Sequence, residues 1–313
     1  MKIIFIGTSE FAAIILEKLV KSTNQPFLVI SAPDKAVGRK QIVTSPPVAA
    51  LAEKYKIPVV QPEKISESSG EIRKLSPDLI ILAAYGQIIP ENILTSPKYD
   101  SINVHPSLLP LWRGPSPIQH AILNGDKRTG VTIMKMTTEL DAGPILLQKE
   151  MEMTGQEDFQ ELHDKLAKFA AELLNEAIFK IFSGKISLQL QDDSKATYSK
   201  ILKKEDGKID WQKPAQILER QIRAFSVWPG SHAIFNDGKG SKKIKILKAR
   251  VYMPPDKIKY PVGKVLVVPQ NEIGVQCGKD FLVIERLQME GKNEVSSEDF
   301  LRGYTNFIGT ILK

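Results

Sequence analysis

The chain of 313 residues contains a single cysteine, Cys277, and only four histidines. One cysteine cannot form an intrachain disulfide, and the lack of disulfides is typical of proteins in a reducing compartment. The histidines are scattered, so with one cysteine they give no zinc-ligand spacing. We therefore expect no structural metal and a cytoplasmic location.

Long apolar runs are also missing. No run approaches the roughly 20 apolar residues that are needed to cross a bilayer. The chain begins almost directly in a short apolar run at residues 2–6, which argues against a signal or transit peptide. We expect no membrane partner.

Two nucleotide-binding signatures are absent. The turn Gly7-Thr8-Ser9-Glu10 follows the first expected strand, where a dinucleotide-binding fold would carry G-x-G-x-x-G. No G-x-x-x-x-G-K-[ST] loop occurs either. These absences exclude nicotinamide binding and the simplest ATP-dependent activities.

The first half of the chain alternates short apolar runs with helical patterns, which is typical of βαβ units. Expected strands are Ile3–Ile6, Phe27–Ser31, Leu79–Ala83, Ser101–Val104, Gly130–Met136 and Pro144–Lys149; expected helices are Glu10–Lys21, Val48–Lys56 and Gln156–Phe182. Thr154 and Glu157 suit a capping box at the start of the last helix. The stretch Pro33–Pro47 is expected to be a long irregular loop, either functional or a tolerated surface insertion.

Residues 185–205 are polar and weakly periodic, which predicts a linker. Beyond it, short strands with turn signals predict a small β-barrel or sandwich. They are His232–Phe235, Lys243–Leu247, Lys264–Val268, Gly274–Cys277 and Phe281–Arg286.

Positive charge is concentrated in this second part. Residues 206–313 carry a net charge of +6, whereas residues 1–205 carry +1. In the run Lys243-Ile244-Lys245-Ile246, the lysines share one face of the expected strand. A solvated surface with a lysine bias and a surface that binds a polyanion such as nucleic acid both fit this charge alone.

The most informative motif is Asn103-Val104-His105-Pro106, read together with Asp141. Two residues that alternate along a strand point to one side, and Pro106 should end the strand. An amide and an imidazole then lie at the carboxyl end of a strand, where open α/β sheets bind ligands. A nearby carboxylate would complete a set for acyl transfer, with a base, its orienting group and an oxyanion donor.

Other interpretations of these residues are weaker. His105 could be a structural histidine and Asp141 only a turn former. Ser107 or Ser116 could act as a nucleophile with His105, but no G-x-S-x-G elbow is present.

Taken together, several runs closely resemble the formyltransferases that use 10-formyltetrahydrofolate. They are Asn103–Pro110, Trp112-Arg113-Gly114, Gly130–Met134 and Asp141-Ala142-Gly143-Pro144, followed by Ile209-Asp210-Trp211, Ile222–Phe225 and Trp228-Pro229-Gly230. The resemblance extends over nearly the whole chain and is closest to the branch of the family that acts on methionyl-tRNA.

The resemblance implies an α/β fold with two domains. Residues 1–184 would form a Rossmann-like catalytic domain that binds folate, and residues 206–313 a smaller OB-type β-barrel that binds tRNA, with residues 185–205 as the linker. The implied reaction transfers a formyl group from 10-formyltetrahydrofolate to the amino group of initiator methionyl-tRNA, for translation initiation. No metal is implied, and we expect a monomer.

The same resemblance assigns roles to residues. Asn103, His105 and Asp141 would be catalytic; Ser107, Leu108, Leu109, Pro110, Ala84, Tyr85, Gly86 and Gln87 would bind folate; Arg39, Lys40, Lys243 and Lys245 would contact tRNA. An N-formyltransferase acting on an amino-sugar nucleotide is the alternative activity, since such enzymes share the catalytic set. A non-catalytic RNA-binding protein on the same scaffold is disfavoured because the catalytic set is intact.

Overall fold

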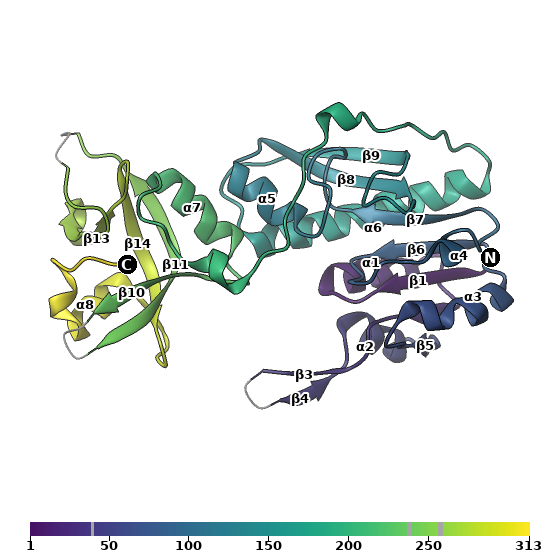
Figure 1. Ribbon diagram of the computed structural model, residues 1–313, viewed down its shortest axis with the longest axis horizontal. Helices are drawn as coiled ribbons and strands as arrows, with labels where there is room; N and C mark the ends of the chain where they lie inside the picture. Colours follow the sequence, from purple (N-terminus) through teal and green to yellow (C-terminus); the bar gives the residue numbers. More distant parts are fainter. Residues whose placement is uncertain (39–40, 237–239, 256–258) are drawn as a thin grey trace. The chain divides into compact units, whose positions relative to one another are not determined.

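The computed structural model describes residues 1–38, 41–236, 240–255 and 259–313 (Figure 1). The chain forms two compact units. The first contains residues 1–117, 128–152 and 162–200, and the second contains residues 118–127, 153–161 and 201–313. Arg39 and Lys40, which we predicted to contact tRNA, lie outside the described residues.

A seven-stranded sheet forms the centre of the first unit, with the strand order β5-β2-β1-β6-β7-β8-β9. The strands are β1 (Ile3–Gly7), β2 (Leu28–Ile30), β5 (Val59–Val60), β6 (Leu79–Ala83), β7 (Asp100–His105), β8 (Arg128–Lys135) and β9 (Ile145–Glu152). The first five are parallel, whereas β8 and β9 are antiparallel to their neighbours. The carboxyl ends of the parallel strands therefore share one edge.

Helices accompany this sheet. They are α1 (Glu10–Val20), α2 (Pro47–Lys54), η1 (Ile65–Ser68), α3 (Ser69–Leu75), α4 (Glu91–Leu94) and α6 (Phe159–Phe182). One face of the sheet, which includes Ile4 and Ile80, packs against residues of η1, α3 and α4. Ile3, Phe5 and Ile81 are buried on the opposite face. Burial on both faces explains why these strands are continuous apolar runs without polar alternation.

The stretch predicted to be an irregular loop contains regular structure. It forms the antiparallel hairpin β3 (Lys35–Val37) and β4 (Ile42–Thr44), which extends away from the sheet (Figure 1). The prediction failed because the neighbouring residues Ile42 and Val43 of β4 are both more than half exposed, so neither face of this strand shows the apolar alternation of a half-buried strand.

The long helix α6 begins three residues later than predicted. The capping box forms at Asp158, whose carboxylate accepts from the Glu161 N–H at 2.9 Å, with a longer reciprocal bond of 3.4 Å from the Asp158 N–H. The predicted pair also interacts, since the Thr154 N–H donates to Glu157 at 2.9 Å, but it lies in the turn before the helix.

The second unit is built on an antiparallel sheet with the order β10-β11-β14-β13-β12, and β15 also pairs with β14. Its elements are α5 (Pro117–Asn124), η3 (Lys204–Gly207), α7 (Ala215–Ala224), β10 (Ser231–Asn236), β11 (Ser241–Tyr252), β12 (Val265–Val268), η4 (Pro269–Asn271), β13 (Glu272–Gln276), β14 (Phe281–Met289), β15 (Glu294–Ser296), α8 (Ser297–Gly303) and η5 (Thr305–Phe307). The short helix η2 (Asp193–Lys195) belongs to the first unit. The predicted fold class, an α/β domain followed by a smaller β-barrel-type domain, is confirmed.

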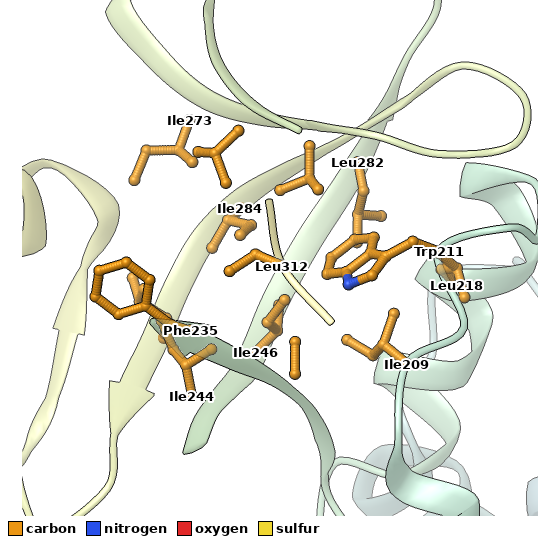
Figure 2. Close-up of a cluster of buried hydrophobic side chains, with 14 of the residues drawn as sticks. Ile209, Trp211, Leu218, Phe235, Ile244, Ile246, Ile273, Leu282, Ile284 and Leu312 are labelled. Carbon is orange, nitrogen blue, oxygen red and sulfur yellow. The ribbon is translucent and has the colours of Figure 1, made fainter. Parts of the chain in front are cut away.

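One apolar core holds the second unit together (Figure 2). Ile244 and Ile246 of β11 point into it with at most 1% of their surface exposed, whereas the intervening Lys245 is exposed. The predicted division of this strand into a lysine face and an isoleucine face is therefore confirmed.

Most of the segment predicted as a linker is part of the first unit, which includes residues up to 200. Among the described residues, none of the helices combines the length and the apolar character that a membrane crossing requires.

We predict that Phe235→Ala destabilises the second unit by about 3–5 kcal/mol, the usual cost of emptying a buried aromatic site. Phe235 has 0% exposure, and its ring lies 4.9 Å from that of Phe307. Urea unfolding followed by tryptophan fluorescence measures this change, since Trp211 lies in the same core. Phe179→Ala is the control, because Phe179 is 67% exposed, and equal losses in both variants would contradict the packing role.

Candidate active site

The candidate site lies where β7 ends. β7 stops at His105, directly before Pro106, as the sequence predicted. Asn103 and His105 lie two residues apart on this strand and are 8% and 4% exposed. β7 pairs with β6 on one side and β8 on the other, so the backbone that carries both side chains is fixed on two edges.

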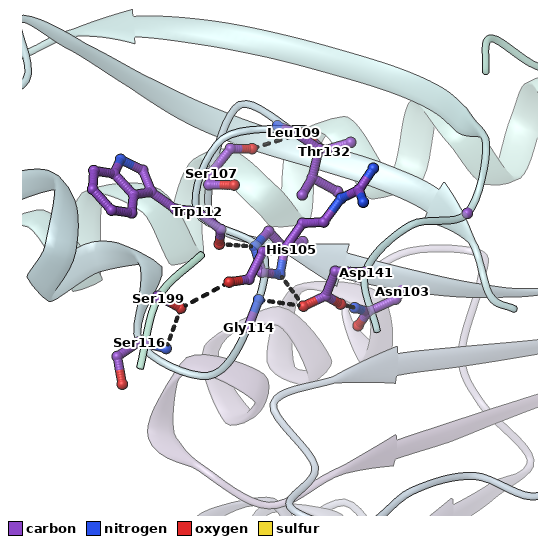
Figure 3. A network of polar contacts seen from close by, with 12 residues as sticks. Asn103, His105, Ser107, Leu109, Trp112, Gly114, Ser116, Thr132, Asp141 and Ser199 are labelled. Carbon is purple, nitrogen blue, oxygen red and sulfur yellow. Dashed lines mark hydrogen bonds and ion pairs between the residues drawn. The ribbon is translucent and has the colours of Figure 1, made fainter. Parts of the chain in front are cut away.

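The carboxylate of Asp141 faces both of these side chains (Figure 3). Its Oδ1 accepts a hydrogen bond of 3.3 Å from Asn103 Nδ2, and its Oδ2 lies 3.6 Å from His105 Nδ1. The Gly114 N–H also donates to Oδ2, at 2.8 Å. The structure therefore brings together the three side chains that we predicted to be catalytic.

The second ring nitrogen of His105 determines the tautomer. Nε2 lies 3.0 Å from the carbonyl oxygen of Trp112. A carbonyl only accepts hydrogen bonds, so Nε2 must carry a proton in this arrangement. The nitrogen that remains to accept a proton is Nδ1, which faces the Asp141 carboxylate. A proton gained there is placed beside a negative charge.

Asp141 adopts an unusual backbone conformation, with a φ of +50°. This left-handed region is unfavourable for a residue with a side chain and persists only where the surroundings impose it. Nearby, a Cβ on Gly143 would lie 1.8 Å from the Lys135 carbonyl oxygen, so only glycine fits there. The turn is therefore held tightly against β8, which orients the carboxylate toward β7.

Residues 107–110, predicted to line a folate site, form a tight turn after β7. Ser107 and Leu109 are only 1% and 3% exposed. The Ser107 hydroxyl donates to the Leu111 carbonyl at 2.6 Å, and Leu109 packs in a small apolar cluster. Leu108 and Pro110 are half-buried. Of these four residues, Leu108 and Pro110 keep some side-chain surface.

The other predicted folate segment, residues 84–87, follows β6. The register between β6 and β7 pairs Leu82 with Asn103, so Ala84 lies level with His105. Ala84 and Gly86 are exposed, and a Cβ on Gly86 would meet no atom of the described residues within 4 Å. Tyr85 is half-buried, its hydroxyl has no hydrogen-bond partner in the part of the chain that the structure describes, and burial raises its pKa. Open space therefore adjoins this backbone.

Gln87 turns away from that space. Its side chain accepts from the Ile65 N–H at 2.9 Å and donates to the Glu63 carbonyl at 3.0 Å. It holds the neighbouring loop in place.

Residues 189–199, which were predicted to belong to a linker, contact the candidate site. In this segment Gln191 donates to the carbonyl of Asp141 at 2.8 Å, and Thr197 accepts from the Trp112 N–H at 2.8 Å. The Ser199 hydroxyl donates to the Arg113 carbonyl at 3.1 Å. No local signal predicts these contacts, because the segment is polar and has no periodicity.

The predicted tRNA contacts Lys243 and Lys245 lie on β11. Their neighbours are cationic too: Lys243 lies near Lys204 and Lys245, and burial together with these positive charges lowers its pKa. The pKa of His232, opposite Lys245 on β10, is lowered by burial and then by Lys243. Positive charge is therefore concentrated on this face of the second unit.

Within the described ranges, no group of three or more histidine, cysteine, aspartate or glutamate side chains is placed to hold a metal ion.

Two family models match the chain. The model described as formyl transferase matches residues 1–178, and the model of the formyl transferase C-terminal domain matches residues 201–305.

The chain is 40% identical over 314 residues to a methionyl-tRNA formyltransferase of Geobacter sulfurreducens, with 100% of this chain and 96% of the relative covered. It is 42% identical over 316 residues to one of Caldanaerobacter subterraneus subsp. tengcongensis, with both chains fully covered.

Solved structures share the fold at lower identity. WlaRD, a sugar 3N-formyl transferase, superposes with a TM-score of 0.65 at 21% identity, covering 94% of this chain and 99% of its own. HypX from Aquifex aeolicus in complex with tetrahydrofolic acid superposes with a TM-score of 0.64 at 18% identity, covering 98% of this chain and 48% of its own. The matches over the whole sequence place this chain in the methionyl-tRNA formyltransferase family, within the wider group of formyl transferases.

Proposed function

We propose that the protein transfers the formyl group of 10-formyltetrahydrofolate to the amino group of initiator methionyl-tRNA, and that Asn103, His105 and Asp141 are its catalytic residues. The observation that carries this proposal is the convergence of Asn103 and His105 on the carboxylate of Asp141, in a chain with full-length relatives that are about 40% identical. The solved sugar formyltransferases support the fold alone, at 21% identity or less.

Each residue has a distinct task in this proposal. The folate supplies a formyl group whose oxygen gains negative charge when the amine attacks. Asn103 has two amide hydrogens, of which one is used on Asp141, so the second is left for this oxygen. His105 takes the proton of the amine on Nδ1, and Asp141 stabilises the resulting positive charge at 3.6 Å. The tetrahedral intermediate then collapses: the bond between the formyl carbon and the folate nitrogen breaks, the formyl group stays on the amine, and tetrahydrofolate leaves with a proton that His105 returns.

A folate site beside these residues fits the chain. The exposed backbone of Ala84 and Gly86 offers N–H and C=O groups, and open space adjoins Gly86. Such groups suit the flat, polar edge of a pterin ring. We propose that residues 84–86 and the part-exposed Leu108 and Pro110 form this site, while Ser107, Leu109 and Gln87 shape it from behind.

The second unit is proposed to hold the tRNA. Burial lowers the pKa of Lys243, and Lys204 and Lys245 lie close enough to lower it further. Like charges repel one another, and phosphates would relieve that repulsion. We propose that catalysis takes place in the first unit, which extends past the predicted boundary at residue 184 to residue 200, and that residues 206–313 bind tRNA as predicted. A monomeric state and a cytoplasmic location also remain predictions.

The acceptor can be tested directly. With 10-formyltetrahydrofolate and charged initiator tRNA, the purified protein is expected to formylate the methionyl amine. Separation of formylmethionine from methionine after hydrolysis measures the product. An amino-sugar nucleotide is the comparison acceptor; formylation of that compound with none of methionyl-tRNA would overturn the proposed acceptor.

We predict that Asn103→Ala lowers kcat at least about a hundredfold, because losing one oxyanion donor costs roughly 3 kcal/mol. The KM for folate should stay within about twofold, since the amide acts on charge that develops during the reaction. Asn103→Asp is the comparison variant. It keeps the shape and removes the donors, so it should be similarly slow. Wild-type turnover in either variant would remove Asn103 from the mechanism.

We predict that replacing Lys243 and Lys245 by glutamine weakens tRNA binding and reduces the slope of log K against log salt concentration by about 1 for each lysine. Filter binding over a salt series measures this slope. The matched control is Lys248→Gln on the same strand, because Lys248 is already paired with Glu285 at 3.1 Å. An unchanged slope in the double variant would exclude a phosphate contact.

A further inference from the structure

Residues 189–199 run across the loop that contains Trp112, Arg113 and Gly114. Backbone hydrogen bonds fix both ends of this crossing segment. Gln189 exchanges two bonds, of 2.8 and 2.9 Å, with Ile145, and the Arg113 N–H donates to the Thr197 carbonyl at 2.9 Å. The two family models match residues 1–178 and 201–305, so the crossing segment belongs to neither.

Gln191 lies between these two attachments and uses both ends of its amide. Its Oε1 accepts from Arg113 Nε and Nη2 at 3.1 and 2.8 Å. Its Nε2 donates to the carbonyls of Asp141 and Gly143 at 2.8 and 2.7 Å. A primary amide has two donor hydrogens, so both are used. Gln191 thus joins the loop after β7 to the turn that carries Asp141.

Arg113 fixes which way the amide points. Its guanidinium is buried, with 4% of the side chain exposed, and forms an ion pair of 2.6 Å with Asp193. Burial lowers the pKa of Arg113, but the hydrogen bonds that Arg113 makes with Asp193 and Tyr198 outweigh this effect and raise it overall. An arginine only donates, so the oxygen of Gln191 must face it. The Gln191 NH₂ group is then directed at the Asp141 turn.

We propose that Gln191 is a positioning residue for formyl transfer, which acts through Asp141. The backbone of Asp141 has a φ of +50° and needs external contacts to hold that conformation. The two hydrogen bonds from Gln191 hold the backbone carbonyls of Asp141 and Gly143. The carboxylate of Asp141, in turn, contacts Asn103 and His105. This inference rests on the proposed catalytic role of Asp141.

The side-chain chemistry explains why glutamine suits this position. Methionine has a similar length but would leave two carbonyls without a donor. Glutamate could still accept from Arg113 but would place negative charge against the same carbonyls. Either replacement removes the two hydrogen bonds that Gln191 makes to the Asp141 turn. A displacement of about 1 Å at a reacting group can cost a hundredfold in rate.

The first experiment compares Gln191→Met and Gln191→Glu with Gln189→Met. Gln189 is the same residue type, two positions earlier, with an exposed side chain. Both Gln191 variants are expected to lower kcat roughly 10- to 100-fold, with KM for both substrates within about twofold; Gln189→Met should match the wild type. Gln191→Glu keeps the acceptor for Arg113, so it remains informative if Gln191→Met does not fold. Wild-type kcat in a folded Gln191 variant would overturn the proposal.

A double-mutant cycle with Asp141→Asn tests whether Gln191 acts through Asp141. In the Asp141→Asn background, a Gln191 variant should lower kcat by less than about threefold, because the group that it positions is already lost. Losses that multiply in full would instead indicate a general structural role and overturn the proposal. Wild-type turnover in Asp141→Asn alone would show that the catalytic assignment itself is wrong, whatever the Gln191 variants do.

Discussion

The carboxylate of Asp141 is the point on which the candidate site depends, because three separate parts of the first unit meet there. Asn103 and His105 reach it from the end of β7, and the Gly114 N–H reaches it from the loop that follows. The crossing segment holds its backbone through Gln191. A carboxylate accepts several hydrogen bonds at once, so one side chain can hold groups from different elements in place.

The candidate site is largely closed to water. The side chains of His105 and Asp141 are 5% and 10% exposed. Electrostatic interactions are stronger in such surroundings than in bulk water, which favours a base that gains positive charge beside an acid. The same burial makes any unpartnered polar group costly. The partners of Asp141 and Arg113 are therefore part of the geometry of the candidate site as much as of the fold.

In the proposed function, the first unit carries out formyl transfer and the second unit binds the tRNA. The sheet of the first unit supplies rigid strand ends on which small side-chain groups can be placed within hydrogen-bonding distance. The second unit presents lysines on one face of β11, where long side chains can follow a phosphate backbone without a fixed geometry. Chemistry on one carbonyl needs the first kind of surface, and binding of a large polyanion needs the second.

Local sequence patterns predict the strands whose faces are both buried or clearly divided, such as Leu79–Ala83 and the β11 alternation around Ile244, because burial leaves an apolar pattern in the chain. They also predict that Asn103 and His105 lie on the same face of one strand, since strand geometry and Pro106 act over neighbouring residues. The β3–β4 hairpin, whose strand β4 is exposed, and the four hydrogen bonds of Gln191, which join residues about 50 to 80 positions apart, are known only from the folded chain. Contacts at that separation leave no periodic trace in the chain, so they are fixed only when the fold brings the segments together.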